Sequence, residues 1–284
     1  MIKITECPRD AMQGIESFIP TKDKIKYLQS LLSVGFDVLD FGSFVSPRAI
    51  PQLKDTAEVI EGLDLSDTKT KLLAIVASKK GGEIAANFEQ ITYLGFPFSF
   101  SPTFLEKNIK SSLDKAVQTT EDFQNICIRK DKMLLQYISM AFGNPYGEDW
   151  FKDMIYQWVD KFYTMGIRNI TLSDITAEAN AEDIFEIYQY LIHHYPKVEF
   201  GIHLHTSLAK WKDLVHSAYM AGCRNFDTVL NGMGGCPMSG EELLQNLNTY
   251  DLLIYLKENH ISNNLSISSL NQSLEIANTI FPKD

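Results

Sequence analysis

Short apolar runs alternate with longer amphipathic stretches along most of this 284-residue chain. Apolar runs of four to nine residues rich in β-branched and aromatic side chains indicate buried strands, whereas an apolar residue every three or four positions indicates a helix. We predict eight strands, at Ile2–Cys7, Phe36–Phe41, Lys71–Ala77, Ile91–Ser99, Met133–Ser139, Asn169–Ser173, Val198–His205 and Asn225–Leu230. We predict helices between them, including Lys22–Val34, Leu105–Phe123, Asp149–Met165, Ala181–His194 and Leu208–Ala221.

Three glycines mark the places where a helix should end and a strand begin. Gly35, Gly166 and Gly222 each follow a predicted helix directly, at the position where a helix C-cap is expected. Eight strand–helix units without an internal break predict an α/β fold of the (β/α)8 TIM-barrel type. The alternative is a doubly wound open sheet. The first strand leads into Cys7-Pro8-Arg9-Asp10 and not into a glycine-rich phosphate loop, which weakens a dinucleotide-binding interpretation.

The C-terminal part of the chain does not continue the alternation of strands and helices. Asn259–Ser269 is rich in Asn and Ser, and Leu270–Ile280 has the pattern of a last helix. We therefore predict one TIM-barrel domain over residues 1–284, with residues 259–284 as a C-terminal helical extension packed on the barrel.

Composition excludes several classes of partner. A formal net charge of -10 disfavours binding to nucleic acid or to an anionic membrane, and we find no apolar run long enough to cross a bilayer. The chain starts with a strand pattern and not with a secretory signal. Its four cysteines lie far apart without a C-x-x-C pair, which indicates free thiols in a reducing compartment and hence a cytoplasmic location.

The predicted seventh strand carries two histidines that share one face. Successive side chains of a strand alternate, so His203 and His205 point one way while Ile202 and Leu204 point the other. Active sites of such barrels lie at the carboxyl ends of the strands, where Asp10 follows the first strand. One carboxylate and two imidazoles suit a divalent ion such as Mg²⁺ or Mn²⁺, and Zn²⁺ is also compatible. On their own, all three residues also fit ordinary polar positions near strand ends.

An amide oxygen, such as that of Asn246, would complete these protein ligands. Beside Asp10, Arg9 at a barrel mouth must be paired or must await an anion. It would stabilise an enolate as negative charge develops, or form a salt bridge with Asp40, and the two interpretations are compatible.

The eighth strand leads into a glycine-rich segment, Gly232-Met233-Gly234-Gly235-Cys236-Pro237. Glycines permit a mobile loop, and a cysteine on such a lid would reach the site when substrate is bound and transfer a proton there. The alternative is a tight turn with a buried, inert thiol.

Taken together, these residues resemble the 3-hydroxy-3-methylglutaryl-CoA lyase family of metal-dependent TIM-barrel carbon–carbon lyases. The resemblance extends from Thr5 to about Leu256. Its motifs are Glu6-Cys7-Pro8-Arg9-Asp10-Ala11-Met12-Gln13, Gly42-Ser43-Phe44-Val45-Ser46-Pro47, Phe104 with Lys107-Asn108, Tyr137-Ile138-Ser139, Ser173-Asp174, His203-Leu204-His205 and the Gly232–Pro237 segment. The Pro-Arg-Asp and Gly-Gly-Cys-Pro motifs are the ones specific to the lyase branch.

The resemblance implies a role for each matching position. The implied metal ligands are Asp10, His203, His205 and Asn246. The implied catalytic residues are Arg9, Cys236, Asp174 and His203. The residues expected to bind the substrate are Gln13, Asp40, Ser43, Asn108 and Tyr137. Barrels of this family are often dimers, so the resemblance allows a homodimer.

Four departures from the family pattern bear on the substrate more than on the metal. Asp40 stands where Glu is usual, Thr206 where Asp is common and Ser173 where Gly is usual, and Met238–Gln245 differs in composition. The implied reaction is cleavage of the small-molecule substrate 3-hydroxy-3-methylglutaryl-CoA into acetyl-CoA and acetoacetate. Two alternatives stay open: a related lyase or aldolase acting on another 3-hydroxy acyl-CoA or a 4-hydroxy-2-oxo acid, and a non-catalytic barrel that only binds a metal or CoA.

Overall fold

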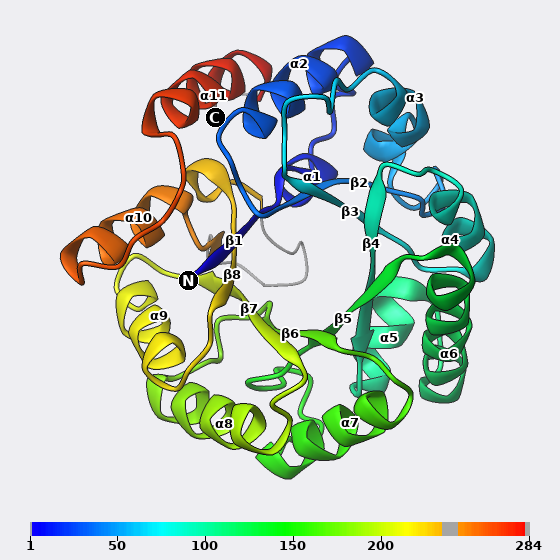
Figure 1. Ribbon diagram of the computed structural model, residues 1–284. Helices are drawn as coiled ribbons and strands as arrows, with labels where there is room; N and C mark the ends of the chain where they lie inside the picture. Colours follow the sequence, from blue (N-terminus) through cyan, green and yellow to red (C-terminus); the bar gives the residue numbers. More distant parts are fainter. Residues whose placement is uncertain (1, 235–243, 282–284) are drawn as a thin grey trace.

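Eight parallel strands close into a barrel (Figure 1). The computed structural model describes residues 2–234 and 244–281. The strands follow one another around the barrel in chain order, and pairing of β6 with β7 closes it, which confirms the predicted TIM barrel and excludes the open sheet. The barrel strands are β1 (Lys3–Glu6), β2 (Val38–Ser43), β3 (Lys71–Ile75), β4 (Ile91–Ser99), β5 (Met133–Ser139), β6 (Asn169–Asp174), β7 (Glu199–Thr206) and β8 (Asn225–Thr228).

Helices form a ring outside the strands (Figure 1). The helices are α1 (Pro8–Gln13), α2 (Thr21–Leu32), α3 (Thr56–Glu61), α4 (Lys79–Ala86), α5 (Pro102–Ile109), α6 (Leu113–Lys130), α7 (Lys152–Thr164), α8 (Ala181–His194), α9 (Trp211–Met220), α10 (Thr249–Glu258) and α11 (Ile267–Ile280), with 3₁₀ turns η1 (Pro51–Leu53) and η2 (Leu230–Gly232). Helix α1 lies inside the ring, against the barrel (Figure 1). Within the described ranges, no helix combines the length and the apolar character that a membrane crossing requires.

The single helix predicted over Leu105–Phe123 is wrong, because the chain forms α5 and α6 there. Lys110 adopts a left-handed conformation (φ 50°) and ends α5, and the Ser112 hydroxyl accepts the Lys115 N–H to begin α6. The predicted helix over Leu208–Ala221 likewise begins later, at Trp211. Between α5 and α6 the left-handed Lys110 and the Ser112 cap set the boundary, whereas α9 begins at Trp211 without a side-chain cap.

The C-terminal extension lies beside α2 (Figure 1). The Ser266 N–H donates to the Val34 carbonyl at 2.9 Å, and the rings of Tyr27 and Phe281 meet edge to face at 5.4 Å between centroids. This contact packs α11 against one side of α2.

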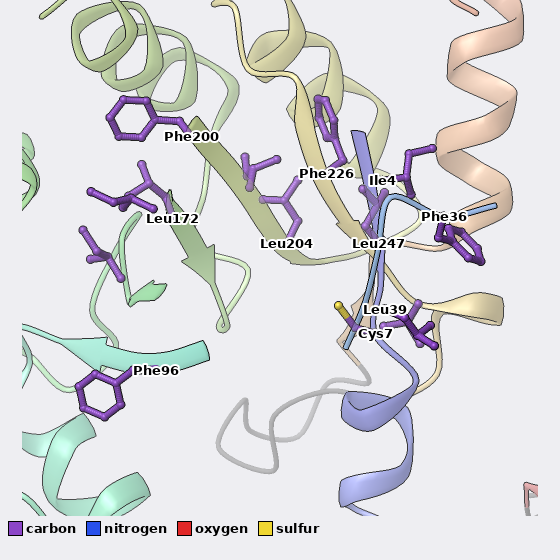
Figure 2. Close-up of a cluster of buried hydrophobic side chains, with 14 of the residues drawn as sticks. Ile4, Cys7, Phe36, Leu39, Phe96, Leu172, Phe200, Leu204, Phe226 and Leu247 are labelled. Atoms are coloured by element: carbon purple, nitrogen blue, oxygen red, sulfur yellow. The ribbon is translucent and has the colours of Figure 1, made fainter. Parts of the chain in front are cut away.

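Two hydrophobic layers follow from strand alternation. Outward side chains such as Phe200 and Leu204 of β7 and Phe226 of β8 are buried beneath the helices (Figure 2). A separate cluster that includes Leu73 and Tyr93 fills the barrel interior. Polar side chains occupy the inward positions nearer the carboxyl ends of the strands, which is where the candidate site lies.

A short strand, β9 (Gln245–Asn246), was not predicted. It pairs antiparallel with β7 and places Asn246 opposite His205. About forty residues after β7, the chain therefore returns to the barrel mouth and places the Asn246 amide beside His205.

Glu6 is a fully buried acid outside the candidate site, between the barrel and α10. Its carboxylate accepts the Leu230 N–H at 2.5 Å and the hydroxyls of Thr228 and Thr249 at 3.1 and 2.7 Å. Burial raises the pKa of Glu6 from 4.5 to about 7, although these three donors act against the rise.

This raised pKa makes a testable contribution to stability. The folded protein keeps a proton on Glu6 that the unfolded chain releases above pH 4.5, so stability falls as pH rises and the loss is complete above pH 7. The loss reaches about 3 kcal/mol for a shift of this size. Glu6→Gln keeps an acceptor for Leu230 and cannot ionise.

Urea denaturation of the metal-free protein between pH 5 and 8.5 measures the effect. We expect the free energy of unfolding of Glu6→Gln to fall less with pH than that of the wild type, with the gap opening between pH 5 and 7. Parallel curves for the two proteins would show that Glu6 does not titrate in this range.

Candidate metal centre and active site

Asp10, His203 and His205 meet at the mouth of the barrel. One ligand atom of each lies within 4.8 Å of the others. Asp10 lies on α1, which starts at Pro8 directly after β1, and both histidines lie on the inward face of β7. All three side chains are buried. Their predicted proximity is thus confirmed, and their role as metal ligands stays a prediction.

Hydrogen bonds orient the two imidazoles. His203 Nδ1 lies 3.3 Å from Asp227 Oδ2, and His205 Nδ1 lies 3.1 Å from the Ile175 carbonyl oxygen. Both acceptors require a proton on Nδ1, which leaves the Nε2 lone pair of each ring free.

The two rings differ in basicity. For His203, burial lowers the pKa, but the hydrogen bond to Asp227 and its charge act more strongly together, so the pKa is raised. For His205, burial and the nearby His203 lower the pKa to about 4. His205 is therefore neutral at pH 7, the state in which imidazole binds a metal.

Asn246 supplies a buried oxygen without a hydrogen bond. Its Nδ2 donates to Asp10 Oδ2 at 2.9 Å and to the Met233 carbonyl at 3.1 Å. Its Oδ1 is buried and has no hydrogen-bond partner in the part of the chain that the structure describes, while the amide is close enough to His205 to affect the pKa of that ring. An unpaired buried oxygen is costly unless something else binds it. One carboxylate, two imidazoles and this oxygen form a donor set that fits a divalent cation.

Arg9 lies against the same cluster. Its Nε and Nη2 donate to Asp40 Oδ2 at 2.9 and 2.6 Å, and Nη1 donates to Asp10 Oδ1 at 3.1 Å and Gln13 Oε1 at 2.8 Å. The predicted Arg9–Asp40 salt bridge is confirmed. Among the described residues, these bonds use four of the five guanidinium N–H groups, so one Nη2 hydrogen has no acceptor there.

The charges in this network are unevenly balanced. Burial acts against ionised Asp10, yet the Arg9 charge and the two histidines hold its pKa below the usual value. Burial raises the pKa of Asp40 to about 6 despite Arg9, and the buried Asp40 Oδ1 has no hydrogen-bond partner within residues 2–234 and 244–281. Arg9 stays protonated, because both acids raise its pKa further. The network therefore presents a fixed positive charge beside the donor set.

Of the residues predicted to bind the substrate, Gln13 and Tyr137 contact acids of the site, as Asp40 contacts Arg9, whereas Asn108 does not. Gln13 Nε2 donates to Asp10 Oδ1 at 2.5 Å, and the Tyr137 hydroxyl donates to Asp227 Oδ2 at 3.2 Å inside the barrel. Asn108 is exposed on α5, where its amide donates to the Phe104 carbonyl of the same helix. Their substrate-binding roles stay predictions.

Ser43 and Asp174 make mainly structural contacts in this state. The Ser43 hydroxyl donates to the Ile75 carbonyl at 3.1 Å, which ties β2 to β3. The Asp174 carboxylate accepts N–H groups of Thr176, Glu178 and Ala179 and so shapes the loop after β6. Burial raises the pKa of Asp174 to about 6, against those three bonds. Their predicted functional roles stay predictions.

The predicted lid cysteine, Cys236, lies outside the described residues. The described chain leading toward it reaches Gly234, which has a φ of +79° and lies against the Asp10–Ala11 backbone. A Cβ at Gly234 would come within 2.8 Å of the Asp10 carbonyl oxygen, so only glycine fits this approach.

Sequence reasoning missed one residue of the site, Asp227. It is buried on the inward face of β8 and contacts His203 and Tyr137. Strand alternation over Asn225–Thr228 carried the signal, because it puts Asp227 on the face opposite Phe226. Its proximity to His203 depends on the pairing of β7 with β8.

Two relatives of known name are similar to this chain over most of its length. The hydroxymethylglutaryl-CoA lyase YngG of Bacillus subtilis is 27% identical over 263 residues, which are 93% of this chain and 87% of that protein. The human mitochondrial hydroxymethylglutaryl-CoA lyase is 27% identical over 282 residues, covering 98% of this chain and 84% of that protein.

Solved structures show the same relationship. An HMG-CoA lyase from Acinetobacter baumannii, in complex with coenzyme A and 3-methylmalate, superposes with a TM-score of 0.90 at 26% identity and covers 99% of this chain and 91% of that one. The HMGL-like family model matches residues 2–277. With a match over nearly its whole length, the chain belongs to the HMGL-like family.

Proposed function

We propose that this protein is a divalent-metal-dependent carbon–carbon lyase that cleaves 3-hydroxy-3-methylglutaryl-CoA into acetyl-CoA and acetoacetate. Relatives that bear this activity in their names align over most of the chain, and the A. baumannii relative binds coenzyme A. The observation that carries the proposal is the cluster of Asp10, His203 and His205 directly beside the Arg9 guanidinium.

The reaction itself needs a cation site and an anion site close together. The tertiary C3 hydroxyl loses its proton, the C2–C3 bond breaks, and C3 becomes the ketone of acetoacetate. The bonding electrons pass into the thioester as an enolate, which takes up a proton at carbon to give acetyl-CoA. One proton leaves and one returns, so the two groups that handle them decide the efficiency of the site.

The donor set would hold the cation through Asp10, His203, His205 and Asn246. When bound there, a divalent cation supplies a Lewis acid that favours ionisation of a hydroxyl in the substrate. Because the ligands are two nitrogens and two hard oxygens with no thiolate, we propose Mg²⁺ or Mn²⁺ as the ion, with Zn²⁺ as the competitor to test.

Arg9 is proposed to stabilise the enolate. Its side chain is 12% exposed and is held by Asp40 on one side and by Asp10 and Gln13 on the other. Such a preorganised guanidinium does not need to reorient as negative charge develops on the thioester oxygen, and its remaining Nη2 hydrogen is available to that oxygen.

The proton-transfer groups are proposed from the resemblance alone. Cys236 would return the proton to carbon, and Asp174 would accept the hydroxyl proton, because a His203 ring with a proton on Nδ1 and the cation on Nε2 would have no free lone pair. Burial raises the pKa of Asp174 to about 6, which is closer to a working pH of about 7 than the pKa of an ordinary Asp and therefore favours reversible proton transfer. A cytoplasmic location and a homodimer also stay proposals.

The test is product formation from the purified chain after removal of metal with EDTA. We expect no acetoacetate without metal, recovery with Mg²⁺ or Mn²⁺, and a preference for 3-hydroxy-3-methylglutaryl-CoA in a panel that includes other 3-hydroxy acyl-CoA esters and 4-hydroxy-2-oxo acids. A preference for another 3-hydroxy acyl-CoA ester would change the proposed acyl group, and a preference for a 4-hydroxy-2-oxo acid would exclude CoA thioesters as the substrate class. Single-turnover measurements without product from any panel member would leave a metal- or CoA-binding barrel.

A further inference from the structure

Three buried side chains meet on the inner wall of the barrel, away from the exposed end of the donor set. Asp227 Oδ2 lies 3.3 Å from His203 Nδ1 and accepts the Tyr137 hydroxyl at 3.2 Å. The Tyr137 and His203 rings lie nearly perpendicular, at 88°, with centroids 6.3 Å apart. Asp227, His203 and Tyr137 are each at most 9% exposed, so water does not compete for these contacts.

The backbone fixes this meeting point. His203 and Asp227 are register partners on the parallel strands β7 and β8, and both side chains point inward. Tyr137 reaches Asp227 from β5 across the barrel. Because three different strands supply the contacts, none of these side chains can turn away without disturbing the other two.

We propose that Asp227 is the positioning residue of His203: it holds the ring in the tautomer that leaves Nε2 free for the cation, and Tyr137 in turn fixes the Asp227 carboxylate. This inference rests on the proposed function, since it assumes that His203 is a metal ligand. A carboxylate behind a ligating histidine orients the ring and increases its ability to donate electrons.

His205 provides an internal comparison. Its Nδ1 lies 3.1 Å from a backbone carbonyl, that of Ile175, and not from a carboxylate. The Nδ1 groups of the two histidines therefore have different partners, and only the partner of His203 Nδ1 is a side chain that can be exchanged. Substitution at Asp227 consequently tests one ligand without altering the backbone that supports the other.

A competing interpretation uses the same residues. Ligand atoms of Cys7, His203 and Asp227 also lie within 4.8 Å of one another, so Asp227 and Cys7 could themselves hold a metal with His203. That arrangement would take up Nδ1 of His203, the atom that the positioning proposal assigns to a hydrogen bond. The two interpretations predict different effects for a change at Cys7.

The experiment measures binding of Mn²⁺ alone, without substrate, by the loss of the free-ion EPR signal. We expect Asp227→Asn to raise the Kd about 10- to 100-fold, the range found when second-layer partners of a metal site are removed. Tyr137→Phe should raise it less, because the carboxylate remains. Cys7→Ala should bind Mn²⁺ as the wild type does, and His203→Ala should lose binding.

A matched control removes the same charge elsewhere. The control is Asp37→Asn. Asp37 is exposed at the amino end of β2, where its carboxylate accepts the Ile4 N–H, and the amide oxygen of asparagine can accept the same N–H. We expect wild-type affinity from this variant. Thermal unfolding of each variant separates a local effect from a folding defect.

A second readout reports the tautomer directly. In ¹⁵N-histidine-labelled protein, the His203 resonances, assigned by their loss in His203→Ala, should show protonated Nδ1 and bare Nε2 in the wild type and a mixture in Asp227→Asn. Wild-type Mn²⁺ affinity together with an unchanged tautomer in Asp227→Asn would overturn the positioning role and leave the proposed function intact. Loss of Mn²⁺ binding in both Asp227→Asn and Cys7→Ala would overturn the positioning role in favour of a metal site that includes Cys7. Undiminished Mn²⁺ binding by His203→Ala would instead remove the metal site on which the proposed function rests.

Discussion

Replacing His203 by alanine, or Asp10 by asparagine, is expected to lower kcat for thioester cleavage by at least about 10³-fold, because each loses several kcal/mol of metal-dependent stabilisation of the transition state. The two residues come from different parts of the chain and share only the cluster at the barrel mouth. Asp10→Asn keeps the shape of the side chain, so its loss of activity reflects loss of charge. Steady-state kinetics at saturating Mg²⁺ or Mn²⁺, with Mn²⁺ binding measured in parallel, tests this prediction.

His193→Ala is the matched control for the histidine variant. His193 is exposed on α8, in the outer helical layer, and should be replaceable without change in kcat or metal affinity. Wild-type-like turnover by His203→Ala would remove the metal centre from the proposed mechanism.

Replacing Arg9 is expected to give the second large loss of kcat. Two different substitutions at this position distinguish its effect on catalysis from its effect on the stability of the fold. Arg9→Lys keeps the charge, but the three N–H groups of one ammonium cannot replace the four bonds to Asp40, Asp10 and Gln13 and also donate to the substrate. We expect kcat to fall about 10²- to 10³-fold, as it does when a preorganised donor to a developing oxyanion is lost. KM should change little, since the interaction strengthens in the transition state.

Arg9→Met should in addition destabilise the fold by about 3–5 kcal/mol, because it leaves the buried Asp40 carboxylate without its partner. The double variant Arg9→Met with Asp40→Asn removes both charges. Urea denaturation should show that it regains much of the lost stability, whereas its kcat should stay low. Recovery of activity in the double variant would mean that Arg9 acts by neutralising Asp40 and not on the enolate.

Much of the candidate site was predictable because strand alternation is a local rule. The inward direction of His203 and His205 depends only on their spacing of two within one strand, and the position of Asp10 depends only on its place directly after the first strand. The Arg9–Asp40 pair was predictable for a related reason, since consecutive strands of such a barrel lie side by side. The break between α5 and α6 was not, because a left-handed Lys110 and a serine cap leave the periodic pattern almost unchanged.

The sequence by itself determined the barrel, the face on which the two histidines lie and the end of the barrel where chemistry is possible, since these follow from periodicities of two and 3.6 residues and from the order of the elements. Asn246 was expected near the histidines, but the tertiary structure alone decided that β9 pairs antiparallel with β7 and places Asn246 opposite His205, and that Asp227 of β8 contacts both His203 and Tyr137 of β5. Asp227 lies 24 positions from His203 and 90 positions from Tyr137, and Asp10 lies 236 positions from Asn246. Register across such distances is set by the packing of whole strands and helices against one another, and no local pattern in the chain encodes it.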